Sequence, residues 1–279
     1  MNSNKFDITI SDILFDMVNS ILLSKYKDLF VFKGAFALSS LLRQEHLEEF
    51  ARSTTDIDVL FTRENRSVWR EFYSECSDLL TRNSRLSLRY VNDPSKDHGK
   101  GHSWKHGYIL FDVYRNDYSI PFQTKIDFKE DEPFIGLRIN IPELVGQPFA
   151  VSYEKMIIDK VCNMQWESIL LRYRDIFDVY CLSFVKDFEM KILIETWRNA
   201  KEKGKFMPAP KDTIYFLQDE NIDIIKHNFT VFINKLEFDF GTEFKMFYNR
   251  LCEFVTGIYT TGMGCTKFTK WNLHKGFWV

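Results

Sequence analysis

Long apolar runs are missing from this chain of 279 residues, and so is a leader-like start. No stretch approaches the length of apolar residues that a helix needs to span a bilayer. The first ten residues, MNSNKFDITI, lack a basic segment followed by an apolar one. We therefore expect no membrane span and no secretion signal, and we predict a cytoplasmic protein.

Paired cysteines and a strong net charge are missing as well. The five cysteines are an odd number at scattered spacings, with no CxxC pair. This pattern predicts reduced thiols and no zinc site. The formal net charge is only −2, so no protein-wide basic field gathers nucleic acid, and any contact with nucleic acid must be local.

The composition that is present predicts a folded protein of two domains. Hydrophobic residues make up 45% and charged residues 27% of the chain, and 27 Phe supply core material. Strand-like alternation stops near 145–151 and helical spacing follows, which predicts a domain at 1–148 and a helical domain at 149–279. The expected strands lie at 29–32, 56–61, 85–91, 107–114, 124–128 and 137–141. The expected helices lie at 13–23, 35–42, 64–83, 190–203, 212–220 and 222–256.

The expected fold class is α+β, a mixed sheet with helices followed by a helical bundle. The aromatic and basic C-terminal segment, FTKWNLHKGFWV, could stack nucleic-acid bases or pack against the protein, and we favour packing. His98, His102 and His106 recur every four residues, but Gly99 and Gly101 between them favour a polar loop over a metal-binding helix.

The stretch 29–61 carries the first chemical signal. It begins with an apolar strand, LFVF, is broken by Lys33-Gly34, and continues with helical spacing in AFALSSLL. Glycine in such a turn lets the backbone approach a ligand closely. The free N–H groups at the start of the helix favour an anion such as a triphosphate.

Two aspartates follow the turn on an alternating segment, DIDVLF. Asp56 and Asp58 are two residues apart, so both carboxylates point to one face of a strand. Such close like charges favour a divalent cation with oxygen ligands. Asp127 on the 124–128 strand is the favoured third carboxylate, Asp112 is its competitor, and either could instead be a surface charge.

A second charged stretch lies at 151–182. Ser152 is suited to cap a helix in which Lys160 lies beside the apolar stripe, where it needs a partner. Arg172, Asp175 and Asp178 follow at spacings of three residues. The spacing alone is equally consistent with an exposed, salt-bridged helix.

Together these motifs resemble the nucleotidyl transferase AbiEii/AbiGii toxin family, within the polymerase-beta-like nucleotidyltransferases. That family combines an apolar strand, Lys-Gly-Gly, an Arg-Ser/Thr pair before Asp-x-Asp, and later a helical Lys followed by Arg-x-Lys/Arg-Asp-x-x-Asp. The matching residues are Lys33-Gly34, Arg52-Ser53, Asp56-Ile57-Asp58, Lys160, Arg172, Arg174, Asp175 and Asp178. The chain departs from the pattern at Ala35, where the family has a second glycine.

The resemblance implies a metal-dependent enzyme that transfers NMP from NTP to RNA, with the tRNA 3′ end as the expected acceptor. It implies the toxin of a prokaryotic toxin–antitoxin or abortive-infection system, with a cognate antitoxin. Asp56, Asp58 and Asp127 would hold two Mg²⁺ ions, and Lys160 and Asp175 would join them in catalysis. The nucleotide-binding set would be Lys33, Gly34, Ala35, Arg52, Ser53, Arg174 and Asp178.

Two other functions remain open from the sequence. One is transfer to a small molecule or a protein hydroxyl, with the same core and another acceptor cleft. The other is a non-catalytic module that binds nucleotide or RNA, in which Ala35 would mark decay. The intact carboxylate set argues against decay.

Overall fold

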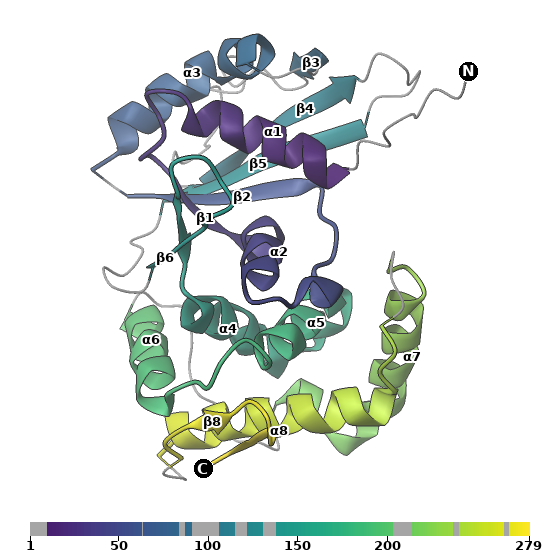
Figure 1. Cartoon of the computed structure of the whole chain (residues 1–279). Helices are drawn as coiled ribbons and strands as arrows, with labels where there is room; N and C mark the ends of the chain where they lie inside the picture. Colours follow the sequence, from purple (N-terminus) through teal and green to yellow (C-terminus); the bar gives the residue numbers. More distant parts are fainter. Residues whose placement is uncertain are drawn as a thin grey trace. The chain divides into compact units, whose positions relative to one another are not determined.

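The computed structural model describes residues 10–62, 64–83, 87–90, 106–114, 122–130, 138–202, 214–236, 240–264 and 268–279 (Figure 1). The chain divides into two compact units. The sheet unit comprises residues 1–46 and 51–151, and the helical unit comprises residues 47–50 and 152–279. The polar loop predicted around His98 and His102 lies outside the described residues.

A seven-stranded mixed sheet organises the sheet unit. Its strands are β1 (Val31–Lys33), β2 (Asp56–Phe61), β3 (Ser87–Tyr90), β4 (His106–Tyr114), β5 (Phe122–Glu130), β6 (Arg138–Asn140) and β7 (Phe149–Val151), in the order β3-β4-β5-β2-β1-β7-β6. β2 runs antiparallel to β1 and parallel to β5. The strand that carries both aspartates of DIDVLF is therefore central, with a partner on each side.

In the described part of this unit, the sheet is accompanied by the helices α1 (Ile10–Leu22), α2 (Gly34–Gln44) and α3 (Arg66–Asn83). Leu14, Met17, Val18 and Ile21 form a buried stripe along α1, as their spacing predicts. α2 follows β1 directly and is almost wholly buried over its first two turns, from Ala35 to Leu42. A helix that is buried in this way holds the turn before it in a fixed position.

The predicted mixed sheet with helices is confirmed, and DIDVLF is a strand over the six residues expected. The sequence missed β7, because three residues after Pro148 are too few to show alternation. This strand pairs in parallel with β1. It thereby covers the edge of β1 that β2 leaves open.

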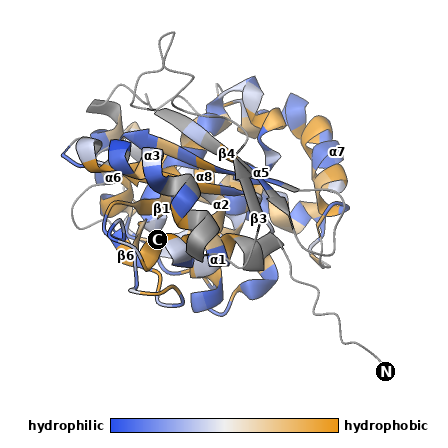
Figure 2. Ribbon diagram, turned by 90° about the horizontal axis from the view of Figure 1, so that it is seen from above, coloured by the Kyte–Doolittle hydropathy of each residue, from blue (hydrophilic) through white to orange (hydrophobic). Residues whose placement is uncertain are grey.

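The helical unit contains α4 (Tyr153–Val161), α5 (Tyr173–Leu182), α6 (Met190–Glu202), α7 (Ile222–Ile233) and α8 (Phe244–Gly262), with 3₁₀ turns at Glu48–Phe50, Cys162–Gln165, Glu167–Leu171, Tyr215–Leu217 and Asp219–Asn221. Figure 2 shows hydrophobic and hydrophilic residues alternating around α7, where Ile225 and Phe229 are buried while Lys226 is exposed. None of the helices in the described ranges is long and apolar enough to cross a membrane.

Two helix predictions for this unit are wrong. The predicted helix at 222–256 is two helices, α7 and α8, and Gly241 between them has a φ of 61°. One right-handed helix cannot run through left-handed backbone of this kind, so the segment 222–256 cannot be a single helix. In place of a helix at 212–220, the described residues form 3₁₀ turns at Tyr215–Leu217 and Asp219–Asn221.

The C-terminal segment packs, as predicted, and forms a hairpin of β8 (Trp271–Asn272) and β9 (Phe277–Trp278). Trp271 and Trp278 are both buried, and each contacts the ring of Phe254 in α8. The Trp271 Nε1 donates a hydrogen bond to the Ser183 carbonyl, and the Trp278 Nε1 donates to the Phe254 carbonyl. Both indoles are therefore part of the hydrophobic core, and their rings are not accessible for stacking against nucleic-acid bases.

Gly257 of α8 makes room for Trp278, because a Cβ there would lie 2.1 Å from Cδ1 of the indole. Alanine normally stabilises a helix over glycine by about 1 kcal/mol. We nevertheless expect Gly257→Ala to lower the free energy of unfolding by roughly 1–3 kcal/mol, because it overpacks the core. Urea denaturation measures this, with Asn249→Ala at an exposed position of α8 as the control. A more stable Gly257→Ala variant would contradict the packing of the hairpin on α8.

Candidate active site

Five of the ionisable side chains that the structure describes lie together on one face of the sheet. Asp58 lies opposite Lys33 of β1 and opposite Asp127 of β5, and Asp56 lies opposite Lys125. Side chains at paired positions, and those two apart along a strand, point to the same side. We call the set Lys33, Asp56, Asp58, Lys125 and Asp127 the carboxylate face.

Lys125 lies between two of the aspartates on this face. Its Nζ donates a hydrogen bond to Asp127 Oδ2 at 3.1 Å and lies 3.6 Å from Asp56 Oδ2. Lys33 Nζ lies 3.9 Å from Asp58 Oδ1, at the outer limit of an ion pair. Within this set of five, three carboxylates lie close to one another, and like charges at such short range favour a further cation.

Burial raises the pKa of Asp58, and the charges of Asp127 and Asp56 raise it further, while Lys33 and Lys125 lower it. Burial also disfavours the charged form of Lys125. The hydrogen bond to Asp127 and the charges of Asp56 and Asp127 together outweigh burial, so the pKa of Lys125 is raised. The surroundings on this face therefore favour the charged form of Lys125 and disfavour the charged form of Asp58.

The third carboxylate was open between Asp127 and Asp112, and the register distinguishes their positions. Asp127 is the direct neighbour of Asp58 in the parallel pairing of β2 with β5. Asp112 of β4 lies opposite Gln123, whose Nε2 donates a hydrogen bond to Asp112 Oδ1 at 3.0 Å. Of the two, only Asp127 lies beside an aspartate of DIDVLF in the strand register.

The glycine turn lies against this face. Gly34 has a φ of +71°, and a Cβ built on it would lie 2.0 Å from Asp58 Oδ2. From the sequence, glycine was expected for the approach of a ligand. The structure adds that Asp58 itself fills the space where any side chain at position 34 would begin.

The backbone at position 35 does not require glycine, although the family pattern has a second glycine there. In the part of the chain that the structure describes, the only non-glycine residues with positive φ are His46 and Gln147. Ala35 therefore has ordinary helical backbone, as the first full turn of α2 requires. Lys33, the N-cap of α2, makes no side-chain capping hydrogen bond. The first N–H groups of this helix thus have no side-chain cap at the N-cap position.

If the carboxylate face binds divalent cations, as we propose below, Gly34→Ala is expected to weaken binding of Mn²⁺ by roughly tenfold or more, because the new methyl group displaces the Asp58 carboxylate. The control is Gly146→Ala in the same unit. Gly146 has a φ of +74°, and a Cβ there would meet nothing within 4 Å. Both variants carry a similar backbone strain of about 1 kcal/mol. Equal Mn²⁺ affinity in the two, measured by calorimetry, would contradict the role given to the contact with Asp58.

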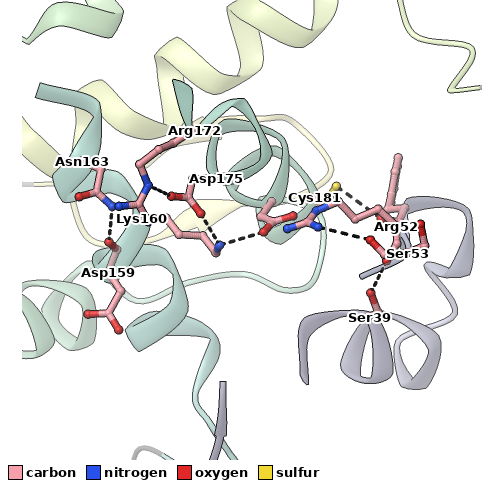
Figure 3. A network of polar contacts seen from close by, with 11 residues as sticks. Ser39, Arg52, Ser53, Asp159, Lys160, Asn163, Arg172, Asp175 and Cys181 are labelled. Carbon is pink, nitrogen blue, oxygen red and sulfur yellow. Dashed lines mark hydrogen bonds and ion pairs between the residues drawn. The ribbon is translucent and has the colours of Figure 1, made fainter. Parts of the chain in front are cut away.

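Hydroxyl groups fix the segment that leads into β2. Ser39 Oγ of α2 donates a hydrogen bond to the Arg52 carbonyl at 2.8 Å, and Ser53 follows on the surface (Figure 3). Thr124 Oγ1 of β5 donates to the Thr55 carbonyl at 2.5 Å. The predicted Arg52-Ser53 pair is thus held between α2 and the start of β2, within the sheet unit.

The helical unit contains a buried charge cluster around Lys160 of α4. Its Nζ donates hydrogen bonds to Asp175 Oδ1 and to Asp178 Oδ2, both at 2.8 Å, and Arg172 Nε donates to Asp175 Oδ2 at 2.6 Å. Figure 3 shows Lys160 and Arg172 approaching Asp175 from two sides. The Lys160 side chain is 12% exposed and that of Asp178 only 2%. The alternative of an exposed, salt-bridged helix is therefore wrong for Asp178 and for Asp175, whose side chain is 13% exposed, whereas Arg172 is exposed.

Burial opposes the charge on Lys160, but Asp178 and Asp175 outweigh it and raise the pKa of the lysine. The partner that the sequence required for Lys160 is thus a pair of aspartates. Arg174 is exposed on α5. The convergence of Lys160, Asp175, Arg174 and Asp178 with the carboxylate face on one cleft stays a prediction.

Sequence reasoning missed Lys125. The signal was present in TKIDF, because a strand over these residues puts Lys125 on the same face as Asp127. What the sequence could not supply is the register that sets Lys125 opposite Asp56.

The glycine turn thus packs against the paired aspartates on a central strand, which brings together two of the motifs that carry the resemblance to nucleotidyltransferases. The family model described as "Nucleotidyl transferase AbiEii toxin, Type IV TA system" matches residues 16–250, so the chain belongs to this family. The resemblance noted from the motifs is thereby confirmed, and the match extends well beyond residue 182.

Two solved structures from Helicobacter pylori have a similar fold. One protein, described provisionally as a nucleotidyltransferase, has a TM-score of 0.52 at 11% identity, over 95% of this chain and 100% of that one. The other, JHP933, has a TM-score of 0.52 at 11% identity, over 94% of this chain and 96% of that one. No curated protein matches the chain. At this identity the structures support the fold alone.

Proposed function

We propose that this protein transfers NMP from an NTP to an RNA acceptor with the aid of divalent cations, and that the acceptor is the 3′ end of tRNA. In this proposal it acts in the prokaryotic cytoplasm as the toxin of a pair with a cognate antitoxin. Membership of the AbiEii nucleotidyl transferase toxin family supports the reaction class and the toxin role.

The contact between Gly34 and Asp58 is the observation on which the proposal rests. It connects the proposed phosphate site with the proposed metal site, because phosphates bound at the turn at the start of α2 would lie beside the carboxylates of β2. Gly34 allows this approach, and the N–H groups at the start of α2 together with the Lys33 ammonium offer positive charge to phosphate oxygens.

The carboxylate face suits Mg²⁺ in its chemistry but not in its present arrangement. Asp56, Asp58 and Asp127 supply the hard oxygen ligands that Mg²⁺ prefers. Within the described ranges, however, no three His, Cys, Asp or Glu side chains stand ready to hold a metal ion. On this face Lys125 lies between Asp56 and Asp127, and in our proposal the three carboxylates hold Mg²⁺ once Lys125 moves aside. Bound Mg²⁺ would neutralise charge on the attacking and leaving oxygens.

The test is transfer of label. The protein is incubated with Mg²⁺ and each α-labelled NTP in turn, together with total RNA, total protein and a small-metabolite fraction. We expect label in the tRNA band and release of pyrophosphate. Label on protein or on a small molecule would overturn the RNA acceptor, and transfer that persists in EDTA would overturn the metal dependence. Absence of transfer with every NTP would overturn the reaction.

A further inference from the structure

The carboxylate face already contains a cation. Lys125 Nζ lies 3.1 Å from Asp127 Oδ2 and 3.6 Å from Asp56 Oδ2, so one ammonium group serves two carboxylates on neighbouring strands. The lysine side chain is 34% exposed. It is therefore partly withdrawn from water and partly open to it.

A metal ion and this ammonium would compete for the same oxygens. Mg²⁺ binds carboxylate oxygens at about 2.0–2.1 Å. A metal ion that binds between Asp56 Oδ2 and Asp127 Oδ2 would take the position that Nζ now occupies, and two cations there would repel each other strongly. Occupancy of this position by metal thus requires Lys125 to leave.

We propose that Lys125 is a built-in counter-ion of Asp56 and Asp127 that a divalent cation must displace. This role rests on the proposed function. Without nucleotide, Lys125 lowers the affinity of the face for metal. With nucleotide, the displaced ammonium, on its flexible four-carbon stem, is free to pair with the phosphates that arrive with the metal. Lys125 is thereby a positioning residue that ties loading of the metal to the presence of the triphosphate.

The proposal predicts that removing Lys125 raises the affinity for metal. Loss of a side chain with only a structural role would not have this effect. Lys125→Met should bind Mn²⁺ roughly tenfold more tightly than the wild type in the absence of nucleotide, because a competing charge is gone. Lys125→Arg keeps the charge and should bind no more tightly than the wild type. Free Mn²⁺ is measured by electron paramagnetic resonance during titration of the full-length protein.

Lys25→Met is the matched control. Lys25 pairs with Glu71 and Glu75 elsewhere in the sheet unit, so this variant also removes an ammonium group from two carboxylates. It should leave Mn²⁺ affinity unchanged. An equal tightening in Lys25→Met would show a general charge effect and would overturn the specific role of Lys125.

A further variant, Asp58→Asn, separates this inference from the proposed function. In one outcome, Asp58→Asn lowers Mn²⁺ affinity while Lys125→Met leaves it unchanged or weaker than in the wild type. That result overturns the counter-ion role of Lys125 but supports the metal site. Absence of any binding that depends on Asp58, in all variants, overturns the metal site of the proposed function, and the inference with it. Tighter binding in Lys125→Met alone supports the inference, whichever acceptor is labelled.

Discussion

Asp58→Asn is expected to lower the rate of nucleotidyl transfer by on the order of 10²-fold or more, while the protein becomes no less stable. The loss follows from removing a charge beside the glycine turn, where the phosphates are proposed to bind. The unchanged or increased stability follows from the electrostatics of the carboxylate face. Burial and two neighbouring aspartates raise the pKa of Asp58, so its ionised form is unfavourable in the folded state.

The sign of the stability effect can be checked against pH. Because the folded pKa of Asp58 is raised above its unfolded value, the ionised group destabilises the fold at neutral pH. Below the unfolded pKa the group is protonated in both states and the effect disappears. The melting temperature of Asp58→Asn, measured in EDTA, should therefore equal or exceed that of the wild type at pH 7, and any excess should vanish in acid.

Asp28→Asn, at an exposed aspartate of the sheet unit, is the control and should alter neither transfer nor melting temperature. Transfer by Asp58→Asn at the wild-type rate would remove Asp58 from the chemistry. A large drop in melting temperature at neutral pH would instead contradict the unfavourable ionisation assigned to this carboxylate.

The sequence could predict the carboxylate face only in part. The side to which each aspartate points depends on local alternation, whereas its neighbours depend on how the strands pair. Alternation along DIDVLF is local, and it correctly puts Asp56 and Asp58 on one side of β2. The partners of these aspartates depend on strand order and register. Only the pairing of β2 with β5 shows that Asp58 lies beside Asp127 and that Asp56 lies beside Lys125.

Gly34 illustrates the same division. A glycine between a strand and a helix predicts a tight turn, and its φ of +71° agrees with that expectation. The contact that a Cβ would make with Asp58 arises from the antiparallel register of β1 with β2, which sets Lys33 opposite Asp58. No pattern within residues 29–42 carries that register. The sequence therefore identified Gly34 and one reason for glycine there, the tight turn. It could not show the second reason, which is the close approach of Asp58.

Lys160→Ala is expected to lower the free energy of unfolding by about 3–5 kcal/mol, because it removes a largely buried ammonium group that donates hydrogen bonds to two carboxylates. Lys160 is the hydrogen-bond donor to both Asp175 and Asp178, and the Asp178 side chain is almost fully buried. Arg172→Ala is the matched control. Arg172 also pairs with Asp175, but its side chain is 54% exposed. That variant should cost less than about 1 kcal/mol.

This expectation changes how the catalytic role of Lys160 must be tested. The motif resemblance implies that Lys160→Ala abolishes transfer, yet a destabilised helical unit would abolish it as well. Lys160→Arg separates the two explanations, because the guanidinium retains the charge that Asp175 and Asp178 require. Its planar fork does not reproduce a compact ammonium toward a phosphate. We expect Lys160→Arg to recover most of the stability but less than full transfer, both measured well below the melting temperature. Recovery of transfer in proportion to stability would make Lys160 a structural counter-ion and would limit the proposed chemistry to the carboxylate face.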